Sequence, residues 1–424
     1  MRFLLAALAL LSLLGCSSEK SPGASSPFPS PSPSSPSSSS SSRSPSSSSS
    51  SRSPSSSSSS RSPSSPPSKV KSFRTLLGVS LAPELGRRSG LRASSPPRAS
   101  SLAQAATLQL AELLDHAVFW TDRLDRSPSA PFSDLHVKRW QLKARSSRLV
   151  SLERGCGRLS NRLASFSDGS RACLRYGINP DQVLGETLSF YLSRLLGIRN
   201  VPALALSRVN INAEQWLRVR QDVQGSQWAD KAIVSLTEWI SNLTDVVTPP
   251  SLRTERRRLH PLLEDLGNVT SQEVLELVQW SDLLLFDYLT ANFDRLASNL
   301  LSLQWDPRVM ERSTNNLHRT AKGALVFIDN EAGLVHGYQV LPMWDRYHES
   351  LLKTLCIFRK ETARKIAELH KSQNAASQLL DLYKASEPLA SQMGFLSEEH
   401  AEMLQSRTDR LYKHILQCKA KYSK

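Results

Sequence analysis

The sequence predicts an α+β fold of two lobes, a small strand-rich lobe followed by a mainly helical lobe. Two observations lead to this prediction. Residues 148–177 contain short alternating runs separated by tight turns, which is typical of strands. After Pro249 and Pro250, apolar residues recur at helical spacing over long stretches. Strands with one helix, followed mainly by helices, form the element order of an α+β protein.

The first sixteen residues read as a secretory signal peptide. Arg2 precedes an apolar run over residues 3–14, and small residues follow, in the order that such signals have. The run is shorter than the roughly 20 apolar residues that span a bilayer. An uncleaved short signal anchor is the alternative. Residues 13–16 also resemble a bacterial lipobox, in which Cys16 would carry a lipid, but the simpler interpretation places Cys16 near the cleavage site.

Residues 17–68 form a Ser/Pro/Arg-rich segment that we expect to be disordered. A unit of Arg-Ser-Pro and serines recurs, with Arg43, Arg52 and Arg61 spaced nine apart. Such a segment has little apolar surface to bury and therefore cannot offset the entropy of ordering. A nuclear phosphorylated tail has similar composition, but behind a signal peptide an O-glycosylated stalk is the better interpretation.

The remaining residues divide into three predicted regions. Residues 69–145 form an N-terminal region with a helix expected near 102–120, residues 146–250 the strand-rich N-lobe, and residues 251–424 the helical C-lobe. About 350 residues are enough for one large domain or two lobes.

Charge and cysteine content exclude some classes of partner. The net charge is +15, yet no aromatic-rich basic module for nucleic acid is present, so acidic matrix or anionic substrates fit a secreted protein better.

Behind the signal four cysteines remain, an even number that favours two disulfides in an oxidising compartment. No cysteine or histidine cluster has zinc spacing. The sequons at Asn242 and Asn268 would be glycosylated there.

Turn and capping residues fix several elements of the predicted fold. Asp168-Gly169 between two alternating runs predicts a hairpin. Asn179 as the N-cap and Pro180 as the first helical residue predict a helix that ends at Gly197. Strands are expected at 201–209, 232–239 and 324–329. Thr270 and Glu273 form a capping box for a helix through residue 289, and two or three amphipathic helices should fill 348–424.

Three segments together point to phosphoryl-transfer chemistry. Gly155 and Gly157 form a turn that lets the backbone approach phosphates. Asp294 and Asn299 have the spacing of a kinase catalytic loop, where the Asp accepts the substrate hydroxyl proton and the Asn holds a metal ion. Asp329 ends an apolar strand, where a metal-binding carboxylate would lie.

Each of these residues also has a structural interpretation. Asp294 could cap a helix, Asp329 could lie in an ordinary turn, and Glu186 could be a solvated helix charge. The kinase order of the segments, after a two-lobed pattern, favours the functional interpretation. The predicted architecture is therefore a two-lobed, atypical protein-kinase-like fold.

Residues from about 150 to 420 closely resemble the four-jointed box proteins. The resemblance is carried by the strings LERGCGRLSNRLASF, ACLRYGINP, LLFDYLTANFDRLASNLLSLQWDPRVM, VFIDNEAGLVHGY and HILQCKAKY. It implies an atypical Golgi and secreted Ser/Thr kinase, related to the Golgi casein kinases, that uses ATP with Mg²⁺ or Mn²⁺. By the same resemblance Asp294 is the catalytic Asp, Asp329 the metal-binding Asp and Glu186 the lobe-bridging helix Glu. Residues 69–145 would be specific to the family.

The resemblance also implies partners, which are extracellular cadherin repeats of Fat and Dachsous type, and roles in growth, planar cell polarity and neurite extension. One residue departs from the kinase pattern: Arg175 stands where the resemblance places the phosphate-contacting Lys. Arg171 lies on the same face of the strand, and alternation alone does not choose between them. Arg175 would pair with Glu186 or a phosphate. Because Arg and Lys are not interchangeable, a secreted pseudokinase is the alternative function.

Four cysteines allow three disulfide pairings. Cys156 in the glycine turn and Cys173 on the following strand could meet if their strands are adjacent. Cys356 and Cys418 would then tie the last helices to the larger lobe, as the resemblance to the casein kinases also suggests.

Overall fold

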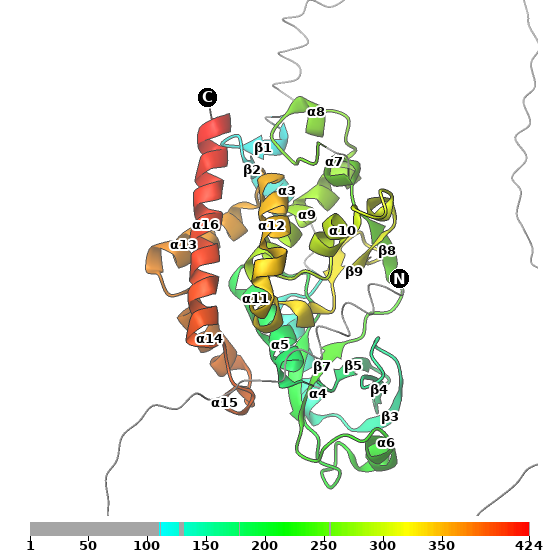
Figure 1. Cartoon of the computed structure of the whole chain (residues 1–424). Coiled ribbons are helices and arrows are strands. Elements are labelled where there is room, and N and C mark those ends of the chain that lie inside the picture. The colour runs from blue at the N-terminus through cyan, green and yellow to red at the C-terminus, as the bar shows by residue number, and fades with distance from the viewer. Residues whose placement is uncertain (1–109, 111, 127–130, 178, 254–255, 424) are drawn as a thin grey trace, which may run out of the picture. The chain divides into compact units, whose positions relative to one another are not determined.

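A five-stranded antiparallel sheet forms the strand-rich lobe in the computed structural model, which describes residues 110, 112–126, 131–177, 179–253 and 256–423. The strand order is β3-β4-β5-β7-β6 (Figure 1). The strands are β3 Leu149–Arg154, β4 Arg162–Phe166, β5 Arg171–Arg175, β6 Leu204–Arg208 and β7 Ile233–Glu238. The Asp168-Gly169 hairpin is confirmed: Gly169 has a φ of +81°, and the Asp168 carboxylate accepts hydrogen bonds from the backbone and hydroxyl of Ser170.

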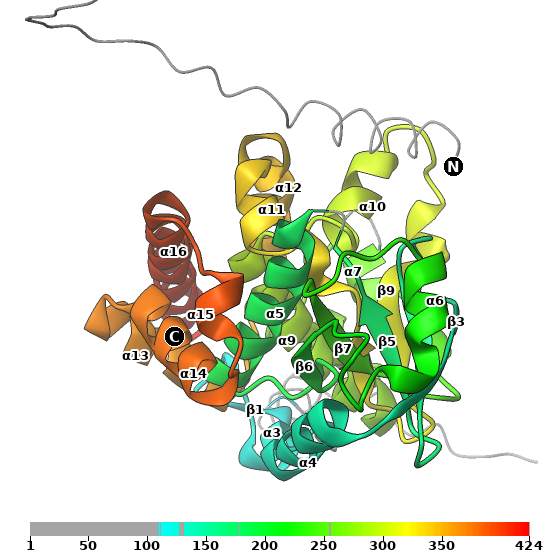
Figure 2. The same cartoon turned by 90° about the horizontal axis from the view of Figure 1, so that it is seen from below.

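The longest helices that pack against this sheet are α4 and α5. Helix α5, Pro180–Leu195, begins as predicted, with the Asn179 side chain accepting from the Asp181 amide. It packs against β6 and β7 and also against the turn that follows β10. Helix α4, Asp134–Ser146, packs on β6 and was not predicted. In α4, the Gln141 side chain donates to the Leu204 carbonyl and so ties α4 to the sheet. Figure 2 shows α4 with the strands from below.

The helix expected near residues 102–120 is confirmed only at residues 110, 112 and 113 and is wrong for residues 114–120, while residues 102–109 and 111 lie outside the described part. Strands β1, Leu114–Asp115, and β2, Phe119–Trp120, form a short antiparallel pair. His116 and Ala117 both have positive φ, which reverses the chain. Leu114, Val118 and Trp120 are buried by tertiary contacts. A bridge joins Phe119 to Phe358, so the spacing of the apolar residues reflects packing against the helical lobe.

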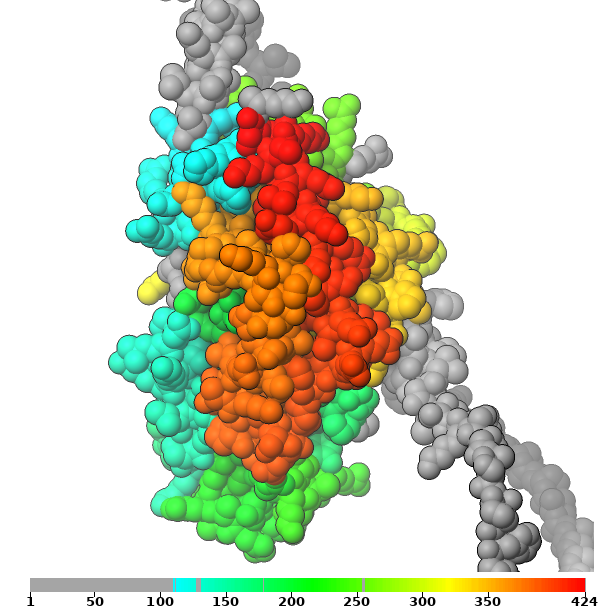
Figure 3. Space-filling view, turned by 90° about the vertical axis from the view of Figure 1, so that its left-hand side faces the viewer, coloured from blue at the N-terminus to red at the C-terminus, as the bar shows by residue number. Residues whose placement is uncertain are grey.

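The helical lobe is built around helix α9, Ser271–Thr290, whose capping box is confirmed. Helices α12, Leu341–Lys353, and α16, Glu398–Tyr422, pack against it. Figure 3 shows α13, α14 and α16 covering one face of the molecule. Residues 348–424 contain more helices than the two or three expected: part of α12, then α13 Lys360–Ser372, α14 Ala375–Ser386, α15 Ala390–Met393 and α16.

A second sheet, of order β10-β9-β8, belongs to the helical lobe. Its strands are β8 Thr244–Val247, β9 Ser313–Arg319 and β10 Leu325–Phe327, the last of which is the strand predicted at 324–329. Strand β8 precedes the predicted lobe boundary at residue 250 but pairs with β9, so the chain enters the second lobe before Pro249 and Pro250.

The remaining elements are short. They are α3 Asp122–Arg126, α6 Arg220–Gly225, α7 Pro250–Arg253, α8 Leu263–Leu266, α10 Leu296–Ser302, α11 Val335–Gln339, and the 3₁₀ turns η1 Leu217–Val219, η2 Val309–Glu311 and η3 Asn330–Ala332. One hydrophobic core runs through both lobes, including Leu188 of α5 and Phe286 of α9. Among the described residues no helix is both long and apolar enough to cross a membrane. The predicted α+β architecture is confirmed.

Candidate active site

Asp294 lies in the turn between α9 and α10. Ala291, with a φ of +52°, ends α9, and the Asp294 amide donates to the Asn292 side chain at 3.0 Å. The Asn316 side chain on β9 donates to Asp294 Oδ2, also at 3.0 Å. Burial raises the pKa of Asp294, and the nearby charge of Asp329 raises it further. The structure therefore brings the two predicted carboxylates into one electrostatic site.

Asp329 follows β10 with a left-handed φ of +54°. Its carboxylate accepts a hydrogen bond from Arg175 Nη1 at 2.7 Å, and Glu331 Oε2 lies 3.5 Å from the same nitrogen. Arg175 comes from β5 in the strand-rich lobe and these carboxylates come from the helical lobe, so the ion pairs join the lobes. Arg171 lies elsewhere, over the Trp239 ring.

The predicted ion pair between Arg175 and Glu186 is not formed. The Arg175 guanidinium bonds Asp329 instead, because the turn after β10 places Asp329 and Glu331 against it. Glu186 is only 1% exposed, so it is not a solvated helix charge. Burial raises the pKa of Glu186, while Arg175 and the Asn330 amide lower it. Its Oε2 has no hydrogen-bond partner among the described residues.

Asn299 lies on helix α10 rather than in the loop that its spacing from Asp294 predicts. The side chain is buried, and its Nδ2 has no partner within the described part of the chain. No hydrogen bond among those residues joins it to Asp294 or Asp329. Its role as a metal ligand therefore stays a prediction.

The buried Arg295, which the sequence analysis missed, holds the site together. It bonds the carboxylate of Asp287 on α9 and the side chain of Asn330. It also donates to the carbonyls of Ile328, at 3.1 Å, and Asn316, at 3.3 Å. These contacts fix the Asp294 turn relative to the Asp329 turn. Burial raises the pKa of Asp287 to about 6, although Arg295 opposes the shift.

Helix α5 approaches the backbone of the Asp329 turn closely. A Cβ on Gly185 would lie 2.9 Å from the carbonyl oxygens of both Glu331 and Gly333. The next residue along the chain is Glu186, and Ser189 donates to the Asn330 carbonyl at 3.4 Å. Gly185 thus permits the contact that brings Glu186 to the site.

The glycine turn between β3 and β4 faces this cluster. Cys156 and Gly157 have φ values of +59° and +80°, and the Asn161 side chain donates to the Cys156 carbonyl. At Gly155 a Cβ would lie 3.0 Å from that of Leu163. Arg158, directly after the turn, forms an ion pair with Glu331. Arg158, Glu331, Asn316 and Arg295 were all missed, because their partners lie far away in the sequence.

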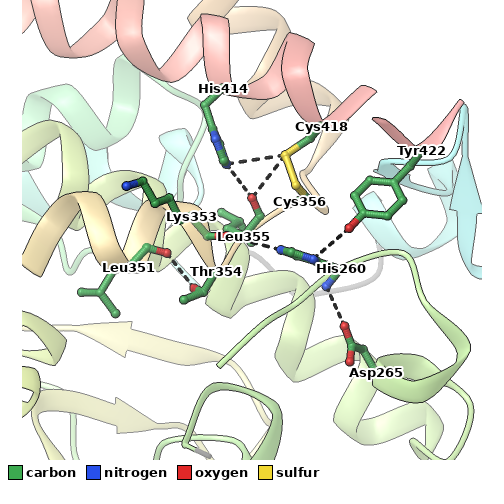
Figure 4. The surroundings of a disulfide bond; sticks show 10 residues. All are labelled: His260, Asp265, Leu351, Lys353, Thr354, Leu355, Cys356, His414, Cys418 and Tyr422. Carbon is green, nitrogen blue, oxygen red and sulfur yellow. Dashed lines mark hydrogen bonds between the residues drawn. A yellow bond between two sulfur atoms is a disulfide. The ribbon is translucent and has the colours of Figure 1, made fainter. Parts of the chain in front are cut away.

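Both predicted disulfides are confirmed. Cys156 bonds Cys173, with Cα atoms 5.7 Å apart, and Cys356 bonds Cys418, with Cα atoms 5.3 Å apart. Figure 4 shows His414 beside the second bond, with its Nε2 against the Leu355 carbonyl. Asn242 and Asn268 are both exposed, as glycan acceptors must be, and their glycosylation stays a prediction.

The donor chemistry of the site fits a divalent cation. Asp329 and Glu331, both against Arg175, supply carboxylate oxygens, which Mg²⁺ and Mn²⁺ prefer. Their oxygens and those of Asp294 do not all lie within 4.8 Å of one another, so a shared ion would require the side chains to move closer. Arg175 and Arg158 place positive charge beside them, as a phosphate ligand requires. The fold and site thus define a two-lobed α+β protein with an acidic interlobe centre suited to metal and phosphate.

Comparison with known proteins identifies the family. The profile of the four-jointed box protein middle domain matches residues 135–421. Four-jointed box protein 1 of Homo sapiens is 51% identical over 360 residues, covering 84% of this chain and 82% of the human protein. The Drosophila melanogaster protein named extracellular serine/threonine protein kinase four-jointed is 31% identical over 376 residues, covering 77% of this chain and 63% of that protein. The chain belongs to the four-jointed box family.

The solved structures that it resembles are more distant. A crystal structure of the Golgi casein kinase with Mn and ADP bound has 13% identity and a TM-score of 0.48, covering 79% of this chain and 93% of the kinase chain. The structure of hydra Fam20 with sugar has 15% identity and a TM-score of 0.44, covering 75% of this chain and 96% of the Fam20 chain.

Proposed function

We propose that this chain is an atypical Ser/Thr protein kinase of the Golgi lumen and extracellular space, acting on cadherin repeats of Fat and Dachsous type. The observation that carries the proposal is the interlobe cluster in which Arg175 pairs with Asp329 and Glu331, with Asp294 near enough for the charge of Asp329 to raise its pKa. The relation to the Drosophila kinase supports the reaction class. Growth, planar cell polarity and neurite extension would be the processes that it regulates.

In the proposed reaction ATP is the phosphoryl donor. The acceptor hydroxyl donates a hydrogen bond to Asp294, and its oxygen forms a bond to the γ-phosphorus as Asp294 takes the proton. The bond from that phosphorus to the oxygen bridging to the β-phosphate breaks, and its electron pair leaves with ADP. The proton then passes from Asp294 to solvent. Asn316 holds the carboxylate in place throughout.

Asp329 is the residue that we assign to the metal, with the Glu331 carboxylate beside it on Arg175. Asn299 remains a second candidate ligand. A divalent cation there supplies positive charge that offsets the charge of the phosphates. Arg175 and Glu186 complete the interlobe site. Arg175 bonds Asp329, and the buried Glu186 reaches the site from α5.

The rival function, a secreted pseudokinase, is favoured by one observation. Arg175 replaces the usual Lys and bonds the carboxylate that we assign to the metal. An arginine in this contact stays charged and competes with a cation for the same oxygen.

Transfer of radiolabelled phosphate to purified cadherin repeats, with Mn²⁺ or Mg²⁺, tests the proposal. Asp294→Asn should lower the rate by roughly 100-fold or more, the range for losing a general base, while keeping nucleotide binding. Asp329→Ala should abolish thermal stabilisation by ATP with Mn²⁺. Asp230→Asn, at an exposed site before β7, is the matched control and should change neither. Nucleotide binding without any transfer by the wild type would favour the pseudokinase.

A further inference from the structure

Arg158 is placed at the site by the glycine turn rather than by the sheet. It follows Gly157, which has a φ of +80° in the turn between β3 and β4. Its side chain is half-exposed and forms an ion pair with Glu331, which lies two residues beyond Asp329. A residue of the β3–β4 turn therefore reaches across the interlobe site to the segment that we assign to the metal.

The electrostatic neighbours of Arg158 locate its guanidinium further. Burial raises the pKa of Asp294 and of Glu331 and lowers that of His336 on α11, and the positive charge of Arg158 opposes the first two shifts and adds to the third. The charge thus acts on the proposed general base and on the acidic turn at the same time. The transferred phosphoryl group must lie between an acceptor held by Asp294 and a nucleotide held near Asp329.

Arg175 is less suited to contact the transferred phosphoryl group. Its side chain is 9% exposed, compared with 50% for Arg158, and it is bonded to the Asp329 carboxylate. Its Nε is buried without a partner among the described residues. Arg175 is fixed by its surroundings, whereas Arg158 has exposed donors at the end of a turn.

We propose that Arg158 is the residue that binds the γ-phosphoryl group, exchanging Glu331 for the phosphate when ATP enters. This inference rests on the proposed kinase function. The planar guanidinium can donate two parallel hydrogen bonds to phosphate oxygens. A terminal phosphate carries more negative charge than the Glu331 carboxylate, so it should compete well for this cation.

The Cys156–Cys173 disulfide supports this role because it ties the turn to β5 two residues before Arg158. The strand that carries Arg175 therefore also anchors the turn that carries Arg158. Asn161, three residues after Arg158, fixes the turn from its other side by bonding the Cys156 carbonyl.

The affinities of ATP and ADP, each measured with Mn²⁺, test the inference in the full chain. Because ADP lacks the γ-phosphate, Arg158→Ala should weaken ATP binding by about tenfold, as for a lost charged hydrogen bond, and leave ADP binding within about twofold. The affinity of Arg158→Lys for ATP should fall between those of the wild type and Arg158→Ala. Arg154→Ala, an exposed arginine at the end of β3, is the matched control and should leave both affinities unchanged. Thermal unfolding should be the same in all variants.

The outcomes separate the two proposals. Binding of neither nucleotide by the wild type would refute the kinase function and the Arg158 role together. Wild-type binding with an unchanged ratio of ATP to ADP affinity in Arg158→Ala would refute the Arg158 role alone. Equal weakening by Arg154→Ala would mean that only the general charge of the turn matters, which also contradicts the assignment.

Discussion

Asn316 is the residue that orients the proposed general base. It lies on β9 with a positive φ, its side chain donates to Asp294, and its carbonyl accepts from Arg295. One residue therefore links the two sides of the site. The sequence offers no signal for it, because Asn316 and Asp294 are 22 residues apart and lie in different elements, Asn316 on β9 and Asp294 in the turn after α9.

Asn316→Ala should slow phosphoryl transfer by about tenfold, the cost of a hydrogen bond to a charged group, with little change in the KM for ATP. The hydrogen bond lowers the pKa of Asp294, so its loss should raise that pKa. The acid limb of the rate profile should then move to higher pH. Asn315→Ala, at the exposed neighbouring position, is the control. An unshifted acid limb would contradict the orienting role.

Asp168 allows a test of stability against pH. The Ser170 hydroxyl and amide, together with Lys143, lower the pKa of Asp168 to about 2. A depressed pKa in the folded state stabilises the protein above the ordinary value near 4, and the gain is lost as pH falls toward 2. Asp168→Ala should therefore lower the urea midpoint at pH 5 and have a shrinking effect between pH 4 and pH 2. The same substitution at exposed Asp230 should show no such trend.

At the scale of elements, capping and turn residues predicted the starts of α5 and α9 and the β4–β5 hairpin, because these signals act within a few residues. Elements decided by tertiary contacts were harder. The kinase spacing of Asp294 and Asn299 predicted a loop, but residues 296–302 form α10. Likewise β8 joins β9 across more than 60 residues, a pairing that local pattern cannot reveal.

Gly185→Ala tests the contact between α5 and the Asp329 turn. The added methyl would meet two backbone carbonyl oxygens at 2.9 Å, and neither can move alone. We expect a loss of about 1–3 kcal/mol in the free energy of unfolding, as for overpacking, and weaker nucleotide binding. Gly225→Ala in α6, where nothing lies within 4 Å, should stay within about 0.5 kcal/mol. Equal effects at both positions would contradict a tight contact.

At the scale of the whole molecule, we expect one disulfide to contribute mainly to stability and the other mainly to activity. Cys356–Cys418 spans 62 residues and ties α16 to the segment after α12, whereas Cys156–Cys173 spans 17 residues beside the site. The sequence predicted both pairings, since one follows from adjacent strands and the other from the family resemblance. The sequence predicted the acidic centre less completely, because the ion pair between Glu331 and Arg158 forms only through the packing of one lobe against the other.

Removing each disulfide should separate stability from activity. Loop closure predicts about 4 kcal/mol for the longer loop and about 3 kcal/mol for the shorter one. The double variant C356S/C418S should therefore lose more stability in urea. C156S/C173S should lose more phosphoryl transfer at a temperature where both variants stay folded, because it frees the Arg158 turn. The reverse order of activities would contradict the tethering role of Cys156–Cys173.

The close approach of Gly185 has a consequence for how such a protein could be controlled. Helix α5 packs against β6, β7, α11 and α14 as well as the Asp329 turn, and all of these contacts would have to break for it to swing outward as a switch. We therefore expect α5 to keep one position. Its amides should exchange with deuterium at the same rate with and without ATP and Mn²⁺, and faster exchange without them would refute this view. If the proposed kinase has no inactive conformation of α5, its activity depends on when and where ATP and the protein substrate reach it. Trafficking through the cell, rather than a conformational change, would then set its rate of phosphorylation.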